Sequence, residues 1–390
     1  MRVLVVSNFP TANTGYGVVV RNLLPRFKKF LDVILFAYYG TQSNCTYEWK
    51  GIKILPKWHD PWGRDIADIH FKQCKADCLL QIYDIWATPQ LPLKVNRVIA
   101  YSPVDTRPVS PYISSVLKKC WKVVPFTHEA YKELKKADVI CEKPIPHGVD
   151  EKIFYPNEEA GAEARKWMGF EKDDFVIGIF GGNYDKMIRK RFDKDFEAIR
   201  YFLDQNPDAK VKIWLHSEVL DVRSGVDLLA MAKAFGLGKI TKSPNQYLMI
   251  TGAIDDRKMA TLYNACDVVL NLSQREGWGL PPFEAYACKT PAIQTDYINM
   301  HELTIPELRV KVQAYYVTGL IAPVAIADSW DAAQKLEKLW KSPDFYKKCA
   351  EKGFKLTEKY HWDDIVEEKW KPFFEKCKEE IKEINEMMSV

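Results

Sequence analysis

The stretch Arg275–Pro291, REGWGLPPFEAYACKTP, decides the fold of this chain. It follows an apolar run, Asp267–Ser273 (DVVLNLS), that is typical of a buried parallel strand. The paired prolines Pro281 and Pro282 favour a helix start, because the missing N–H of proline costs little there. We therefore predict a strand, a glycine turn and a helix whose N-terminus lies at the carboxyl end of the strand.

This turn combines an anion site with two acids. A helix N-terminus attracts anions through its free N–H groups and its dipole, here through the amides of Gly279, Leu280 and Phe283. Glu276 and Glu284 flank it, and carboxylates accept hydrogen bonds from hydroxyls. Taken singly, Glu276 could be a solvent-exposed residue at a strand end, and Glu284 could be an acid in the first turn of a helix, with no role in binding. Taken together, they favour a site for a sugar nucleotide, which has hydroxyls on both sides of its diphosphate.

The segment EGWGLPPFEAYACKTP, residues 276–291, resembles the E-x7-E segment of retaining, family-4-type glycosyltransferases (glycosyl transferases group 1). Glu276 and Glu284 stand eight positions apart, as that motif requires. The resemblance implies an α/β chain of the GT-B fold, with two Rossmann-like, doubly wound domains facing a central cleft. It implies that Glu284 accepts hydrogen bonds from the ribose. The transferred sugar would lie against the catalytic Glu276 and the backbone of Gly277, Trp278, Gly279 and Leu280.

Length and composition favour a two-domain globular protein. At 390 residues the chain exceeds one ordinary core, and 47% hydrophobic with 28% charged residues is typical of soluble proteins. The opening MRVLVVSNFP reads as a strand without a signal peptide, and no apolar run is long enough to predict a transmembrane helix. The nine cysteines form no CxxC, so we expect reduced, mostly buried thiols and a cytoplasmic location.

Charge is uneven along the chain. Residues 1–156 hold 22 Lys and Arg against 14 Asp and Glu, whereas the remainder holds 34 against 38. A basic first half suits an acidic partner, such as phospholipid headgroups, an anionic glycan or nucleic acid. Peripheral contact with the inner membrane face would follow from the first of these. A solvated, lysine-rich surface explains the same counts, and both interpretations stay open.

The N-terminus predicts a Rossmann-like start. Arg2–Ser7 is an apolar strand, the loop Asn8–Tyr16 contains Gly15, and Gly17 opens a helix. The glycines do not form GxGxxG, so the signal for a dinucleotide site is weak. In the resembling transferases a glycine-rich loop stands here, which implies that Gly15 and Gly17 let the backbone approach donor phosphate or acceptor. A plain tight turn is the alternative.

Apolar runs and helical patterns alternate through the rest of the first half. This alternation predicts a parallel, doubly wound sheet. The expected helices are Gly63–Lys75 and Glu129–Lys136, and the expected strands are Leu31–Tyr39, Ile52–Leu55, Cys78–Ile82, Val98–Tyr101, Val123–Phe126 and Val139–Ile145.

Asp105 lies just past a predicted strand, where ligands bind in open α/β sheets. Many resembling transferases have a histidine near this place, but this chain has none between His70 and His128. We predict Asp105 as the substitute catalytic residue. A turn cap before Pro108 is the equally weighted alternative.

The segment PIPHGVDEKIFYP, residues 144–156, resembles the N-G-V-D signature at the end of the first domain of that family. His147 replaces the asparagine, and its role stays open. For Asp150 we expect a capping role in the linker.

A second α/β pattern restarts at Phe175–Phe180 and ends in a glycine turn. The family places an Arg and a Lys after such a turn, which implies that Arg189 and Lys190 contact the donor diphosphate. This makes chemical sense, since a departing nucleoside diphosphate develops charge that fixed cations stabilise. Asn183 replaces a basic residue of the family loop.

Further candidates in this half are weaker. Asp193 and Asp195 form a D-x-D, which we interpret as acids at a helix start rather than metal ligands. His216 ends a predicted strand, as either a satisfied edge histidine or a ligand contact. Leu248–Gly252 is predicted as a strand, and the resemblance implies that the nucleobase lies against the backbone of Ala253 and Ile254.

The C-terminal tail reads as helical, after a predicted strand at Val317–Pro323. Trp362, Trp370 and Phe374 recur at helical spacing and are expected as core anchors. We predict an acceptor-binding domain over residues 1–165 and a nucleotide-sugar domain over 166–371. The resemblance implies that the helix of about 372–390 packs back on the first domain.

Together these features predict a glycosyltransferase that needs no metal and no cofactor, and the resemblance implies that it retains the configuration of the sugar. Its donor would be a UDP- or GDP-sugar and its acceptor a glycan or lipid. A nucleotide-sugar epimerase or hydrolase of the same fold is the first alternative. A nucleic-acid or membrane binder would have no need of the double-acid site, so nucleic acid is not an expected partner. A dinucleotide oxidoreductase is disfavoured by the missing third glycine and ribose acid.

Overall fold

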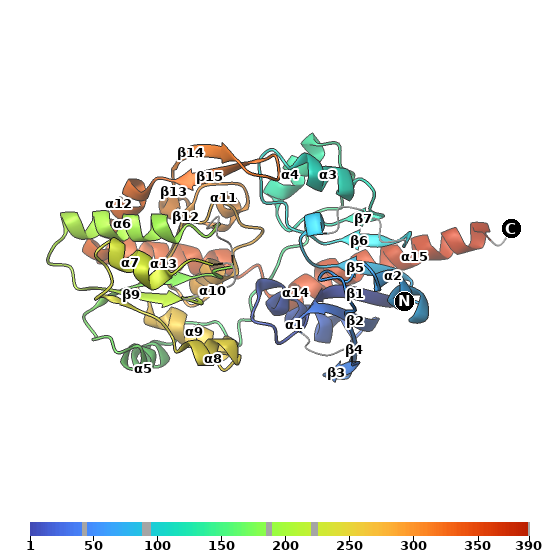
Figure 1. Cartoon of the computed structure of the whole chain (residues 1–390), viewed down its shortest axis with the longest axis horizontal. Coiled ribbons are helices and arrows are strands. Elements are labelled where there is room, and N and C mark those ends of the chain that lie inside the picture. Colours follow the sequence, from blue (N-terminus) through green and yellow to red (C-terminus); the bar gives the residue numbers. More distant parts are fainter. Residues whose placement is uncertain (41–44, 88–94, 185–188, 220–224, 389–390) are drawn as a thin grey trace. The chain divides into compact units, whose positions relative to one another are not determined.

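The computed structural model describes residues 1–40, 45–87, 95–184, 189–219 and 225–388 (Figure 1). The chain forms two compact units. The N-unit comprises Met1–Gly148, Leu320–Ala322 and Tyr360–Val390, and the C-unit comprises Val149–Gly319 and Pro323–Lys359.

The N-unit is built on a seven-stranded sheet with the order β3-β4-β2-β1-β5-β6-β7. Only β3 is antiparallel to its neighbour, so the six parallel strands run in the Rossmann order 3-2-1-4-5-6. The predicted parallel sheet is therefore confirmed. The strands are β1 (Arg2–Asn8), β2 (Asp32–Tyr39), β3 (Tyr47–Trp49), β4 (Ile52–Pro56), β5 (Cys78–Gln81), β6 (Val98–Ala100) and β7 (Lys122–Val123).

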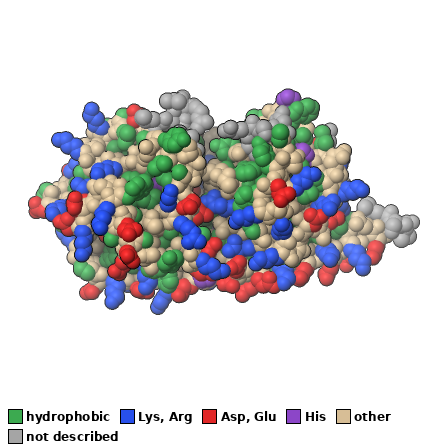
Figure 2. All heavy atoms as spheres, turned by 90° about the horizontal axis from the view of Figure 1, so that it is seen from below, with side chains coloured by type: hydrophobic (Ala, Val, Ile, Leu, Met, Phe, Trp, Pro, Cys, Tyr) green, Lys and Arg blue, Asp and Glu red, His purple; other side chains and the backbone are tan. Residues whose placement is uncertain are grey.

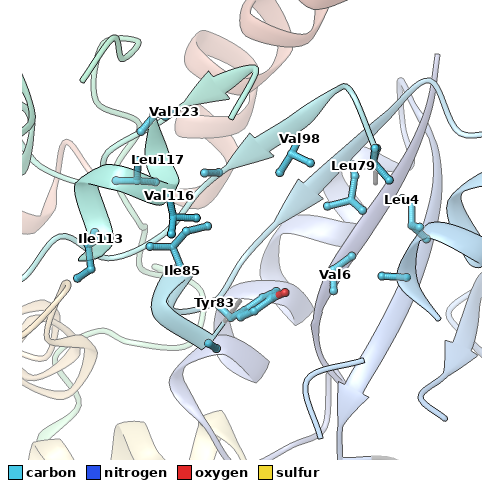
Figure 3. Close-up of a cluster of buried hydrophobic side chains, with 14 of the residues drawn as sticks. Leu4, Val6, Leu79, Tyr83, Ile85, Val98, Ile113, Val116, Leu117 and Val123 are labelled. Carbon is cyan, nitrogen blue, oxygen red and sulfur yellow. The ribbon is translucent and has the colours of Figure 1, made fainter. Parts of the chain in front are cut away.

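Helices flank this sheet. They are α1 (Gly15–Phe27), α2 (Ala67–Gln73), the short η1 (Ile85–Ala87), α3 (Pro111–Leu117) and α4 (His128–Lys136). Figure 3 shows side chains of β1, β5 and β6, such as Leu4, Leu79 and Val98, gathered with Ile113 and Val116 of α3. These strands are apolar almost throughout because helices cover the sheet.

The chain returns to the N-unit at Tyr360, earlier than the predicted residue 372. It forms α14 (Trp362–Ile365), a π-helical turn η3 (Val366–Trp370) and α15 (Lys371–Met388). Trp362, Trp370 and Phe374 are buried, which confirms them as core anchors. The Trp370 ring lies 5.3 Å from the ring of Phe27 on α1, so the return is fastened to the first helix of the unit.

The boundary between the units lies at Gly148, not at residue 165 as predicted. The reason is the helix α5 (Glu158–Met168), which packs on α9 (Asp256–Ala265) of the C-unit. A Cβ on Gly161 would come within 2.4 Å of the Asn264 carbonyl oxygen, so only glycine permits this approach. The charged segment of α5, which has the composition of a linker, is therefore part of the C-unit.

The C-unit repeats the Rossmann order in a parallel sheet, β10-β9-β8-β11-β12-β13. Its strands are β8 (Phe175–Phe180), β9 (Val211–His216), β10 (Thr241–Lys242), β11 (Val268–Asn271), β12 (Ala292–Thr295) and β13 (Arg309–Val310), with an antiparallel hairpin of β14 (Val312–Val317) and β15 (Pro323–Ala327). Its further helices are α6 (Phe192–Gln205), α7 (Leu228–Ala234), α8 (Gln246–Ile250), α10 (Leu280–Ala287), α11 (Asn299–Leu303), η2 (Pro306–Leu308), α12 (Ser329–Lys341) and α13 (Pro343–Thr357).

Three predicted strands are wrong. Leu248–Gly252 falls on the short helix α8, which the Asn245 side chain caps by accepting from the Tyr247 N–H. Val139–Ile145 forms no strand, although Glu142 N donates to Val123 O beside β7. Val317–Pro323 is mostly the turn between β14 and β15. A short apolar run does not by itself distinguish strand from helix or turn.

Cysteine and charge patterns agree with a well-packed interior and a mixed surface. All nine cysteines are free and five are buried, as predicted. On the face shown in Figure 2, Lys and Arg side chains alternate with Asp and Glu. Several N-unit lysines have acidic partners, such as Lys122 with Glu380 at 2.8 Å. Within the described part of the chain, no helix is long and apolar enough to cross a membrane.

Candidate functional site

The two cations and the acid of the predicted donor site meet at the topological switch of the C-unit sheet. The loops after β8 and β11, which lie side by side in the sheet, supply them. Lys190 Nζ lies 2.6 Å from Glu276 Oε1, and Arg189 Nη1 lies 3.0 Å from Glu276 Oε2. Ligands of open α/β sheets bind at this kind of switch point.

The Glu276 carboxylate is buried but ionised. Burial alone would raise the pKa of Glu276, but the Lys190 and Arg189 cations outweigh it and hold that pKa below its usual range. Burial lowers the pKa of Lys190, and Glu276 opposes that shift. The result is a fixed cluster with two positive charges and one negative charge, which carries net positive potential.

Backbone contacts fix the geometry of this cluster. Arg189 Nη1 also donates to the Arg275 carbonyl at 2.9 Å, and Gln274 N donates to the Arg189 carbonyl at 3.0 Å. The Asn299 side chain donates to the Glu276 carbonyl at 2.8 Å. Asn299 was not predicted, because nothing in its local sequence marks it as a neighbour of the E-x7-E segment.

The glycine turn leads into α10 as predicted. Gly279 is the N-cap with φ +92°, a left-handed conformation that glycine adopts without strain. A Cβ there would meet Gln294 Oε1 at 3.3 Å. The Trp278 side chain is buried against Phe283, with ring centroids 5.3 Å apart, so it anchors the turn through packing. Gly277 and Leu280 are half-buried beside it.

Glu284 lies buried on α10 and accepts a hydrogen bond from the Tyr263 hydroxyl at 2.9 Å. Burial and the adjacent Glu284 raise the pKa of Tyr263 well above its usual value, so the hydroxyl stays protonated and donates. Tyr263 also packs on Phe180 of β8 at 4.7 Å. Sequence reasoning missed Tyr263, because its contact with Glu284 joins two different helices, 21 residues apart in the chain.

The D-x-D acids have structural partners at the start of α6. Asp193 pairs with Arg191 at 2.6 Å, and Asp195 accepts from the Leu272 N–H at 2.9 Å. Neither caps the helix with its side chain, since Arg191 occupies the N-cap in the left-handed region. Burial raises the pKa of Asp195 well above its usual value. Over the described ranges, no three His, Cys, Asp or Glu side chains form a possible metal site.

The neighbouring strand ends hold the remaining C-unit candidates. The Asn183 amide bonds to Glu218 O and Val226 O and so fastens the segments that follow β9. His216 stacks on Phe180, and burial lowers its pKa to about 4, so it is neutral near pH 7. The Ala253 carbonyl accepts from Lys258 at 2.7 Å, and the Ile254 side chain is buried.

Two hydrogen bonds of the Thr14 hydroxyl hold the glycine loop of the N-unit. Asn8 Nδ2 donates to Thr14 Oγ1 at 2.6 Å, and Thr14 accepts from Gly17 N at 3.0 Å as the N-cap of α1. A Cβ on Gly17 would approach the Ala12 carbonyl to 2.2 Å, so glycine is sterically required. The helix begins at Gly15, two residues before the predicted start.

Asp105 is buried in the N-unit. Burial is the main cause that raises the pKa of Tyr16, followed by Asp84, and Asp105 adds to the shift. This buried position is compatible both with the predicted catalytic role and with a turn cap before Pro108. His147 packs among Phe126, Tyr101 and Trp362, and burial lowers its pKa to about 3. Asp150 caps the next turn by accepting from Lys152 N, as expected.

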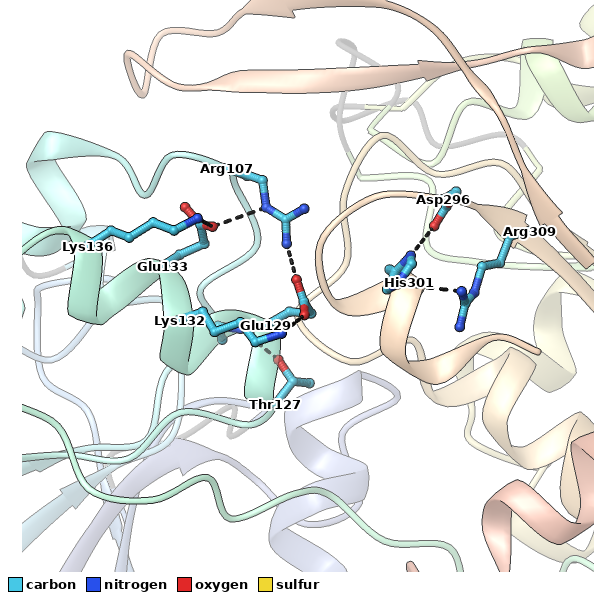
Figure 4. Close-up of polar contacts among 10 residues, drawn as sticks. Arg107, Thr127, Glu129, Lys132, Glu133, Lys136, Asp296, His301 and Arg309 are labelled. Carbon is cyan, nitrogen blue, oxygen red and sulfur yellow. Dashed lines mark hydrogen bonds and ion pairs between the residues drawn. The ribbon is translucent and has the colours of Figure 1, made fainter. Parts of the chain in front are cut away.

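Two polar clusters brace further loops, each within its own unit (Figure 4). In the N-unit, Arg107 pairs with Glu129 and Glu133 of α4, which fastens the segment after Asp105. In the C-unit, His301 Nδ1 lies 2.6 Å from Asp296 after β12. Neither cluster was predicted, because no pattern in the sequence marks these pairs.

Comparison with known proteins gives a consistent picture. Residues 242–356 match the model of the family described as glycosyl transferases group 1. A D-inositol 3-phosphate glycosyltransferase from Segniliparus rotundus is 23% identical over 228 residues, covering 56% of this chain and 43% of that protein. The chain thus spans less than half the length of the curated relatives that it matches first.

Solved structures resemble the whole chain. Sucrose-phosphate synthase from Thermosynechococcus elongatus superimposes with a TM-score of 0.77 at 17% identity, over 97% of this chain and 99% of that one. Anabaena HepE, solved in complex with UDP-glucose, has a TM-score of 0.69 at 13% identity, over 96% and 100%. The chain has the GT-B fold, and its residues 242–356 are similar to the glycosyl transferases group 1 family.

Proposed function

We propose that this protein transfers a sugar from a nucleotide-diphosphate donor to an acceptor, with retention of configuration and without an obligatory metal. The observation that carries the proposal is the buried cluster of Glu276, Lys190 and Arg189 at the C-unit switch point. It stands beside the α10 N-terminus, so side-chain cations and backbone N–H groups converge on one place.

The chemistry of the donor explains each part of this cluster. Breaking the glycosidic bond leaves negative charge on the nucleoside diphosphate, and preorganised cations stabilise it more in the transition state than in the ground state. Lys190 and Arg189 supply that charge within hydrogen-bond reach of Glu276. These cations and the helix dipole supply the role that a metal has in other transferases, which is why we propose metal independence.

The two acids have separate tasks in the proposal. Glu284 is held by Tyr263 and accepts from the ribose hydroxyls. Glu276 lies on the loop nearer the sugar, where positive charge develops as the bond breaks, and stabilises that charge. A UDP- or GDP-sugar is the proposed donor class. The UDP-glucose bound to HepE supports this class, because that protein shares the fold.

Calorimetry with UDP and GDP tests the donor site. Lys190→Ala should weaken binding of the preferred nucleotide by about 1.5–3 kcal/mol, the range for a hydrogen bond to a charged group. The matched control is Lys210→Ala, since Lys210 is an exposed lysine of the same unit that pairs with Asp173. Equal affinity of wild type and Lys190→Ala would remove Lys190 from the donor site.

A nucleotide-sugar hydrolase or epimerase of the same fold is the competing assignment, because it would need the same donor site. Product analysis separates the three activities. Transfer gives a new glycoside only when acceptor is present, hydrolysis gives free sugar without acceptor, and epimerisation gives an altered sugar. Persistence of transfer in excess chelator checks the metal-independent part of the proposal.

A further inference from the structure

The N-unit carries an aromatic corner that the donor chemistry does not use. It consists of Trp62, Trp86, Tyr38 and Tyr83. The Trp62 and Trp86 rings meet edge to face, 5.8 Å apart at 74°, and Trp62 also packs on Tyr38 at 5.5 Å. Tyr38 and Tyr83 are buried, whereas Trp86 is 39% exposed and Trp62 is half-buried. The indole rings of Trp62 and Trp86 are thus the partly exposed members of the corner, and the two tyrosine rings lie buried beneath them.

The corner lies at the edge of the sheet where ligands are expected. Tyr38 is near the end of β2, Trp62 follows β4, and Tyr83 and Trp86 follow β5. These are carboxyl ends of parallel strands, and β5 flanks the point where the strand order reverses from β1. Open α/β sheets bind their ligands at such a point.

The loop that presents Trp62 is preorganised. Asp60 accepts from the backbone N–H groups of Trp62 and Arg64 at 2.9 and 3.1 Å. Asp65 accepts from those of His59 and Asp60 at 2.9 and 3.0 Å. A side chain on Gly63, whose φ is +70°, would collide with Phe36. The Trp62 ring is therefore held in place before any ligand arrives, which lowers the entropic cost of binding.

Polar groups border the same edge. The Tyr16 hydroxyl donates to Asp84 at 2.8 Å, one residue after Tyr83. Burial and the neighbouring Asp84 raise the pKa of Tyr16 well above its usual value, and Asp105 adds to this shift. Asn8 Oδ1 and Thr106 Oγ1 are buried and have no hydrogen-bond partner among the described residues. Buried polar atoms normally have partners, so these two point to a ligand that supplies donors.

We propose that this corner binds a neutral sugar ring of the acceptor, stacked on Trp86 and bordered by Trp62, with its hydroxyls toward Asp84 and Asp105. This assignment rests on the proposed glycosyl transfer and names the acceptor class. A pyranose has an apolar face that suits an indole ring and a rim of hydroxyls that suits carboxylates. Carboxylates repel a sugar phosphate, and an acyl chain would leave the bordering polar groups unpaired.

Binding of small acceptor probes to the full-length protein tests the proposal. We would titrate methyl glucoside, methyl mannoside and methyl galactoside, with glucose 6-phosphate and octyl glucoside beside them, and follow binding by NMR. The variants are Trp86→Ala, Trp86→Phe and Trp330→Ala. Trp330 is the control, because it is an exposed tryptophan of the C-unit.

At least one neutral methyl glycoside should bind, and Trp86→Ala should weaken it about tenfold, the effect of losing one aromatic contact. Trp86→Phe should retain most of the affinity and Trp330→Ala all of it. Tighter binding of glucose 6-phosphate than of every methyl glycoside would overturn the assignment. So would Trp86-dependent binding of octyl glucoside alone, which would make the occupant an acyl chain.

UDP calorimetry on the same variants separates this proposal from the function on which it rests. UDP affinity should be unchanged in Trp86→Ala. If UDP binds but no methyl glycoside responds to Trp86→Ala, the acceptor assignment fails and the donor site stands. If glycosides bind at Trp86 while UDP does not bind at all, the proposed transfer fails and the sugar site stands.

Discussion

At the scale of single residues, the site depends on contacts that the sequence does not display. The spacing of Glu276 and Glu284 predicts two acids around one helix start. Glu276 precedes the N-cap of α10 by three residues, but Glu284 is the fifth residue of the helix and not part of its first turn as predicted. The resemblance to a known family was needed to choose Arg189 and Lys190 from a basic stretch, since their pairing with Glu276 spans 86 residues or more. The hydroxyl that holds Glu284 comes from Tyr263, on a different helix, and the sequence alone left it unmarked.

Tyr263 gives the first prediction. Tyr263→Phe keeps the ring against Phe180 but removes the hydroxyl, so Glu284 loses its positioning partner. We expect donor Kd to rise about fivefold to tenfold, equivalent to the 1–1.5 kcal/mol of one hydrogen bond, with kcat nearly kept. Tyr286→Phe is the control, because it loses a buried hydrogen bond to the Ala292 carbonyl instead. Equal changes of donor Kd in both variants would reduce Tyr263 to a merely structural residue.

At the scale of elements, strands and helices with strong periodicity were predictable. The buried runs of β1, β8 and β11 read directly as parallel strands, and paired prolines marked the start of α10. The hairpin of β14 and β15 was missed, because β14 is largely exposed and β15 is a run of only five residues, so neither shows a clear alternation. The helix α8 was mistaken for a strand, because five residues are too few for a period to show.

The start of α10 supplies the second prediction. Gly279→Ala adds strain at positive φ and brings a Cβ to 3.3 Å from Gln294 Oε1. We expect a loss of about 1–2 kcal/mol in unfolding free energy. Donor affinity should also weaken, because the helix N-terminus must shift. Gly236→Ala is the control: its φ of +72° gives similar strain, but the nearest atom, on Arg200, is 3.7 Å away. A Gly279→Ala variant with wild-type donor Kd would separate this turn from the donor site.

At the scale of the whole molecule, the same strand order occurs twice, and each switch point holds a candidate site. Sequence alternation was enough to predict two α/β units. It did not locate their boundary, because α5 resembles a charged linker while its buried glycine packs on α9. The resemblance to a known family predicted that the chain returns to the N-unit, but the return begins earlier than expected.

Buried histidines make stability depend on pH in both units. Burial lowers the pKa of His147 to about 3 and that of His216 to about 4, from an ordinary value of 6.5. Between those values the unfolded chain binds protons that the folded chain does not, so the unfolding free energy falls as pH decreases below about 6.5. Each histidine contributes a slope of about 1.4 kcal/mol per pH unit.

Denaturant unfolding between pH 7 and pH 5 checks this third prediction. His147→Asn should remove the contribution of His147 to this pH dependence, whatever its effect at pH 7. The exposed His128, replaced in the same way, should leave the slope as it is. An identical pH dependence of wild type and His147→Asn would show that His147 takes no part in it.

The central claim is that Glu276 and Glu284 serve one glycosyl-transfer site with different tasks. Its most direct test is turnover of UDP-, GDP- and ADP-glucose by wild type, Glu276→Gln and Glu284→Gln, with kcat and donor Kd measured for each. The wild type should consume one nucleotide sugar in preference to the others. Glu276→Gln should lower kcat strongly with donor Kd nearly kept, and Glu284→Gln should raise donor Kd more than it lowers kcat. Wild-type kcat and Kd in both variants, or no turnover of any nucleotide sugar by the wild type, would contradict the account.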